Sequence, residues 1–118
     1  RHAETVAALL AGGADPNHRN HYGRTALMFA AGYGHTAIVE QLLSGGADPN
    51  VVPADSEGYT ALAMAAMRGH AEVVAALLRG GADATLRTHD GRTPAELARA
   101  AGHVQVLRLL SLVSTAPT

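Results

Sequence analysis

The sequence predicts an all-α solenoid of about three and a half stacked units, each with two short helices and a hairpin-like loop. Three short motifs recur in step along the chain: Gly-His, Gly-Gly-Ala-Asp and Gly-x-Thr. Starting from His2, the histidines at these positions follow one another at intervals of 33, 35 and 33 residues. A fixed period of that length is typical of linear arrays of one small unit.

The recurring motifs divide the chain into four segments. Residues 1–22 form a partial unit, 23–57 and 58–90 are complete units, and 91–118 form a C-terminal capping unit. The two extra residues of the 35-residue interval fall between Asp48 and Gly58. The inserted Val51-Val52-Pro53 is either an apolar contact for a partner or slack in the loop, and lengthening a loop by two residues costs little free energy.

The first helix of each unit is predicted to begin after a threonine, at Thr25, Thr60 and Thr93. A threonine hydroxyl can cap a helix, and Thr93-Pro94-Ala95-Glu96 has the sequence of a capping box with proline at the first helical position. The glycine of each Gly-His motif is then expected to end this helix in a left-handed conformation.

The second helix of each unit places apolar residues on one face, as in Ile38, Val39, Leu42 and Leu43. Each is expected to stop at a glycine pair that follows it, such as the one at 45–46. Helices of eight to ten residues are shorter than the ~12–15 that are marginally stable alone. Contacts between neighbouring units must therefore stabilise the array.

Composition excludes several classes of protein. The chain has 118 residues, 47% of them hydrophobic and 16% charged, which indicates one globular domain. A formal net charge of −1 provides no basic surface for nucleic acid. The absence of cysteine excludes disulfides and thiolate zinc sites. Apolar stretches are interrupted long before the ~20 residues needed to cross a bilayer, so no membrane interaction is expected.

These motifs, taken together, resemble those of the ankyrin repeat family. Gly-Arg-Thr-Ala-Leu, the paired alanines, Gly-His, the Ile-Val and Leu-Leu pairs and Gly-Ala-Asp-Pro-Asn recur in register over the whole chain. The resemblance implies an ankyrin-repeat solenoid with a helix-turn-helix and a β-hairpin loop in each repeat of about 33 residues. The family's signature proline is replaced by Ala26 and Ala61, and its signature histidine by Met28, Ala63 and Glu96.

Those departures affect the interfaces between units. The resemblance implies that the signature histidine of the family joins adjacent units. Each interface here would therefore lack one hydrogen bond, worth about 0.5–1.5 kcal/mol. The loop asparagine of the third unit is also replaced, by Thr85.

The two ends of the array differ. Residues 1–22 contain only a second helix and its loop, so further repeats or domains are expected upstream in the parent chain. In the last unit Arg99 and Ser111 replace residues that are apolar in the other units, which is how the end of a solenoid becomes soluble.

The seven histidines raise the possibility of a metal site. Those of the Gly-His motifs form a column with one ring per unit, too widely spaced to share an ion, and we expect them to bond to loop backbone. His18, His21 and His89 are the weaker alternative, a metal-binding group, although no third ligand lies near the first two in sequence. We expect no metal and no cofactor.

Catalysis is not expected either. The acidic residues Asp15, Asp48 and Asp83 recur at one loop position, where a carboxylate shapes a turn rather than forming an acid–base pair. No phosphate-binding loop or nucleophile elbow is present.

Surface positions that vary between units are the remaining candidates for function. In the family the hairpin tips and the outward face of the first helices line a concave groove. Tyrosine and arginine often dominate binding energy, and all three tyrosines match groove positions. The predicted partner-binding residues are Tyr22, Arg24, Tyr33, Glu57, Tyr59, Met67, Arg68, Asp90 and Arg92.

The expected function is recognition of a partner protein through this groove, as a scaffold or adaptor without catalysis. The main alternative is a regulatory or targeting segment of a larger multidomain enzyme or channel, where the contacts would be intramolecular. In either case we expect a monomeric, cytoplasmic module that binds protein and neither nucleic acid nor membrane.

Overall fold

The computed structural model describes residues 12–13, 15–20, 23–53 and 58–114, and these contain six helices. The helices come in pairs joined by short turns, one pair in each unit. The pairs are α2 (Ala26–Tyr33) with α3 (Thr36–Ser44), α4 (Ala61–Arg68) with α5 (Ala71–Arg79), and α6 (Pro94–Ala101) with α7 (Val104–Ser114).

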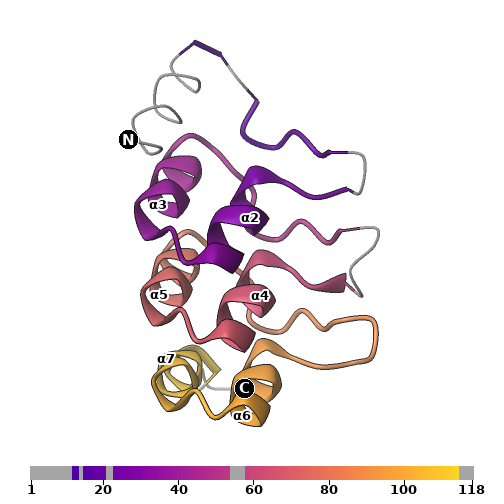
Figure 1. Cartoon of the computed structure of the whole chain (residues 1–118), viewed down its shortest axis with the longest axis vertical. Coiled ribbons are helices and arrows are strands. Elements are labelled where there is room, and N and C mark those ends of the chain that lie inside the picture. The colour runs from indigo at the N-terminus through magenta and orange to yellow at the C-terminus, as the bar shows by residue number, and fades with distance from the viewer. Residues whose placement is uncertain (1–11, 14, 21–22, 54–57, 115–118) are drawn as a thin grey trace.

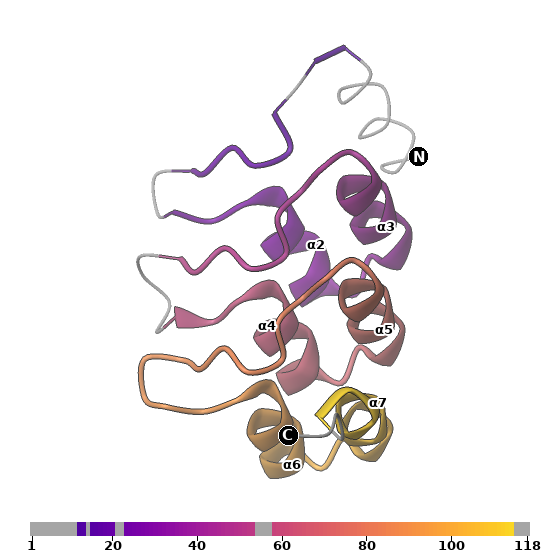
Figure 2. The same cartoon turned by 180° about the vertical axis from the view of Figure 1, so that it is seen from behind.

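The helices form two parallel rows that follow the order of the sequence. Helix α4 packs between α2 and α6 in one row, and α5 packs between α3 and α7 in the other (Figure 1). The loops that join one unit to the next project together on one side of the stack, as the view from behind also shows (Figure 2). The predicted all-α solenoid, with units stacked in sequential order, is confirmed.

Each first helix begins at the predicted threonine. The Oγ1 atoms of Thr25, Thr60 and Thr93 accept hydrogen bonds from backbone N–H groups three residues later, at 3.4, 3.2 and 3.3 Å. The carboxylate of Glu96 in turn accepts from the N–H of Thr93 at 2.9 Å, which completes the predicted capping box. The caps satisfy N–H groups that have no partner inside the helix.

Small residues allow the first helices to approach one another closely. Ala31, Ala66 and Ala98 are fully buried at the contacts between α2, α4 and α6. Leucines from the same helices add to the core, and Leu27 and Leu62 are each 1% exposed. A core without tryptophan is therefore built from short side chains in close contact.

Histidines join adjacent units. The Nε2 atom of His70 lies 3.1 Å from the carbonyl oxygen of Gly32, and that of His103 lies 3.0 Å from the carbonyl oxygen of Met67. A carbonyl oxygen can only accept, so Nε2 carries the proton in both rings. The acceptors lie in the last turn of the preceding unit's first helix, rather than in a loop as expected, because each ring reaches across the interface.

Loop asparagines form a second connection between units. The Nδ2 group of Asn50 donates to the carbonyl oxygen of Gly81 at 3.1 Å, and its Oδ1 atom accepts from the N–H of Asp83 at 2.7 Å. Asn17 makes the same pair of bonds one unit earlier, at 3.1 and 2.6 Å. These bonds and those of the histidines connect each unit to the next.

Thr85 occupies the asparagine position of the third unit and bonds only within its own loop. Its N–H and hydroxyl groups donate to the Asp83 carboxylate at 2.9 and 2.6 Å, and these bonds lower the pKa of Asp83. In the other units a glycine pair follows the second helix, at 45–46 after α3 and at 80–81 after α5. The equivalent positions of the last unit, 113 and 114, still belong to helix α7. No glycine turn is therefore present to receive an asparagine.

We expect Asn50→Ala to lower the free energy of unfolding by about 1–2 kcal/mol, because it removes two hydrogen bonds worth roughly 0.5–1.5 kcal/mol each. Urea unfolding followed by circular dichroism measures this change. Thr85→Ala is the matched control, since Thr85 bonds only within its loop, and a smaller loss is expected. If the two variants lost equal free energy of unfolding, the hydrogen bonds across the interface would add no stability beyond that of a bond within one loop.

Two of the connecting loops are closed by a backbone hydrogen bond. The N–H of Asn20 donates to the carbonyl oxygen of Arg24 at 2.8 Å, and Thr88 and Arg92 repeat this bond at 2.9 Å. Within 12–13, 15–20, 23–53 and 58–114 no residue is in a β-strand. The hairpin-like loop of the prediction is present, but it is only a hydrogen-bonded turn.

The last unit presents polar residues at the end of the stack. Arg99 and Ser111 are exposed, as expected for a solvated end, although Leu112 is also 73% exposed. Most of the predicted partial unit at 1–22 lies outside the described residues. None of the helices in the described part of the chain is long and apolar enough to cross a membrane.

Candidate functional site

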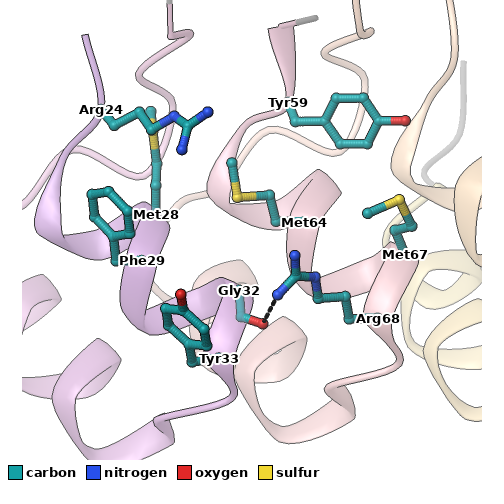
Figure 3. A pocket seen from close by; sticks show the side chains of 9 residues that line it. All are labelled: Arg24, Met28, Phe29, Gly32, Tyr33, Tyr59, Met64, Met67 and Arg68. Carbon is teal, nitrogen blue, oxygen red and sulfur yellow. Dashed lines mark hydrogen bonds between the residues drawn. The ribbon is translucent and has the colours of Figure 1, made fainter. Parts of the chain in front are cut away.

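A hollow of about 380 Å³ lies on the surface of the first helix row, between α2 and α4 (Figure 3). Its walls come from these two helices and from the turns that precede them. The residues that line it are Arg24, Met28, Phe29, Gly32, Tyr33, Tyr59, Met64, Met67 and Arg68.

Helix α2 forms one wall through two pairs of residues four apart. Met28 lies one turn before Gly32 and Phe29 one turn before Tyr33, so all four share one face of the helix. Met28 is 2% exposed and contributes to the floor, whereas Phe29 and Tyr33 are 40% and 66% exposed. Two aromatic rings are therefore accessible to a ligand on this side.

Helix α4 forms the opposite wall with longer and more flexible side chains. Met64 and Arg68 lie one turn apart, with Met67 beside them, and the Tyr59 ring lies near the start of the helix (Figure 3). All of them except the exposed Arg68 are half-buried. Methionine side chains are polarizable and adapt to the shape of what they contact.

The Arg68 guanidinium is held across the hollow by the opposite helix. Its Nη1 atom donates to the carbonyl oxygen of Gly32 at 3.0 Å (Figure 3). The same oxygen accepts from His70, so the end of α2 is joined to the next unit by two side chains. This bond places a positive charge beside the apolar walls.

Five of the nine predicted binding residues surround the hollow: Arg24, Tyr33, Tyr59, Met67 and Arg68. Tyr22 and Glu57 lie outside the described residues. Asp90 and Arg92 are not part of its lining. The structure therefore brings together five of the predicted residues, all from the two complete units, whereas Asp90 and Arg92 lie at the loop that leads into the last unit.

Asp90 and Arg92 instead pair with each other. The Nε atom of Arg92 lies 3.2 Å from a carboxylate oxygen of Asp90, and both side chains are about half exposed. A hydrogen bond from the Thr88 hydroxyl lowers the pKa of Asp90, and the Arg92 charge acts in the same direction. The two charges satisfy each other at the loop tip.

The sequence analysis did not identify three lining residues: Met28, Phe29 and Met64. A signal was present for two of them, because Phe29 and Met64 lie four residues before Tyr33 and Arg68, which were already assigned to the groove. Residues four apart share a helix face, so extending the assigned positions by one turn would have found them.

The histidine alternative gains no support from the arrangement of side chains. Among the residues that the structure describes, no group of three or more His, Asp or Glu side chains could hold a metal ion. His21, one member of the predicted group, lies outside the described residues.

Comparison with known families identifies the repeat. A family model described as "Ankyrin repeats (3 copies)" matches residues 1–88 and again residues 52–115, which together cover nearly the whole chain. A search of curated proteins finds no matching sequence.

Proposed function

The chain belongs to the ankyrin repeat family, and on that premise we propose that it binds a partner protein through the hollow between α2 and α4. Ankyrin repeats are generally protein–protein interaction modules. In this proposal the function is non-catalytic: the stacked helices hold a recognition surface in place for the partner.

The composition of the hollow supports this function. Accessible aromatic rings of Phe29 and Tyr33, buried and half-buried methionines and an arginine meet in one concave place. Tyrosine and arginine are enriched among the residues that dominate protein interfaces, and methionine is enriched at interfaces generally. The helices that carry these side chains are rigid, so little ordering free energy is needed when a partner binds.

We expect the double variant Tyr33→Ala, Tyr59→Ala to reduce capture of the partner from a lysate of the source organism by about tenfold or more. Each centrally buried tyrosine of an interface contributes roughly 2 kcal/mol or more, which is over tenfold in affinity. Quantitative mass spectrometry of proteins retained on the immobilised chain measures the effect.

Val104→Ala is the matched control. Val104 is 64% exposed, close to the 66% of Tyr33, but it lies on α7 and does not line the hollow. It is expected to retain every partner, and thermal unfolding of both variants shows whether the fold is intact. If the folded double variant captured the same proteins as the unaltered chain, the binding site would have to lie outside the hollow.

A further inference from the structure

The lining of the hollow is apolar and positively charged. Among the residues that the structure describes, its lining consists of three methionines, three aromatic residues, two arginines and one glycine, with no carboxylate. An arginine or lysine side chain of a ligand would meet like charge there, whereas a carboxylate would meet opposite charge in a partly desolvated place. The exposed charge of Arg68 therefore favours an acidic ligand.

Arg68 differs in its contacts from Arg79 and Arg87, which form ion pairs. Arg79 lies 3.4 Å from the carboxylate of Glu40, and Arg87 lies 3.6 Å from that of Glu96. Arg68 forms no ion pair with any carboxylate of the described residues, and its Nη1 atom is held by the Gly32 carbonyl oxygen at 3.0 Å. A guanidinium has five N–H donors in a fork that matches a carboxylate, so donors remain for a ligand.

Gly32 opens the space beside this guanidinium. A Cβ atom at Gly32 would lie 3.7 Å from the Met64 sulfur and 3.8 Å from Nη1 of Arg68, so any longer side chain would extend into the hollow. The equivalent residue of the next unit is Met67. Because α2 has glycine where α4 has methionine, space remains between α2 and α4 for a side chain from another molecule.

We propose that the occupant is a linear segment of the partner in which an aspartate or glutamate stands next to a large apolar residue. The carboxylate pairs with Arg68, and the apolar side chain lies against Met28, Met64 and Phe29. A volume of about 380 Å³ is near the lower end of the ~300–1,000 Å³ of small-molecule pockets, which suits one side chain and its neighbour. This inference rests on the proposed function and specifies its ligand.

Selection from a library of random displayed peptides against the whole chain tests the inference. The selected peptides are expected to share an acidic residue next to a large apolar one. A representative peptide, acetylated and amidated at its ends, is then compared with its acid-to-amide version by fluorescence anisotropy. We expect the amide version to bind about tenfold more weakly, because charge-assisted hydrogen bonds are roughly twice as strong as neutral ones.

Arg68→Gln isolates the predicted contact. This variant is expected to bind the acidic peptide about tenfold more weakly than the unaltered chain does, and to bind the acidic and amide peptides equally. Arg79→Gln is the matched control, because Arg79 also ends a helix but does not line the hollow, and it should bind both peptides as the unaltered chain does.

Four outcomes overturn the inference. Selected peptides without an acidic residue, or an Arg68→Gln variant that still prefers the acidic peptide, would contradict the carboxylate contact. If those peptides nevertheless lost binding with Tyr33→Ala and Tyr59→Ala, the proposed function would stand. A selection that yielded no peptide would exclude a linear segment, and peptides indifferent to Arg68, Tyr33 and Tyr59 alike would contradict both proposals.

Discussion

Gly69→Ala is expected to lower the free energy of unfolding by about 3 kcal/mol or more. Gly69 ends α4 with a φ of +78°, a left-handed conformation that costs other residues roughly 1–2 kcal/mol. A Cβ atom there would also lie 2.6 Å from Nδ1 of His103, so the ring must move. Moving the ring disrupts its packing and breaks its hydrogen bond to the Met67 carbonyl oxygen. Such a hydrogen bond contributes about 0.5–1.5 kcal/mol to stability.

Gly102→Ala separates the two causes. Gly102 ends α6 with a φ of +79°, nearly the same as that of Gly69, but a Cβ atom there would meet nothing within 4 Å. Only the backbone cost of about 1–2 kcal/mol is therefore expected. Urea unfolding of the two variants measures the difference, and equal losses would mean that the histidine contact between units contributes no stability.

Gly32→Met is expected to reduce binding of the partner, and of the acidic peptide, by about tenfold or more while leaving the stack folded. The new side chain would extend from α2 into the space between Met64 and Arg68 and would take the ligand's place. Methionine is already present at the equivalent position of α4, as Met67, so the repeat accommodates it. Fluorescence anisotropy with the acidic peptide measures the loss.

Gly32→Ala is the control for a change at this position that leaves the hollow open. A Cβ atom at Gly32 would make only ordinary van der Waals contacts, at 3.7 Å and beyond. Because alanine is favoured over glycine by about 0.8–1.0 kcal/mol inside a helix, this variant should be more stable and bind nearly as the unaltered chain does. If the methionine variant bound equally well, the ligand would not occupy the space beside Gly32.

Much of the fold was predictable because its determinants are local and recur. Thr60 caps α4, Gly69 ends it, and the Thr93–Glu96 capping box starts α6, all as expected from the sequence. Each of these features depends on residues within one helical turn of each other, and a period of 33–35 residues marks them three times over. The family assignment followed from the same recurrence.

The candidate site was predictable only in part. Arg24, Tyr33 and Tyr59 were assigned by their position in the unit, and they do line the hollow. The gap that Gly32 leaves and the contribution of Met28 depend on how α2 faces α4, which the positions of residues within one unit do not specify. The ion pair between Asp90 and Arg92 also depends on the conformation of one particular turn.

The recurrence of local signals was therefore sufficient to establish the type of repeat, the bounds of its helices and the order in which units stack. Only the tertiary structure shows which residues are bonded by side chains that reach across an interface. The His70 ring meets a carbonyl oxygen 38 residues earlier, and Asn50 bonds to residues 31 and 33 positions later. The period of the sequence shows that the units are alike. Contacts between units depend instead on how one unit is shifted and rotated relative to the next, and the packing of the helices determines this.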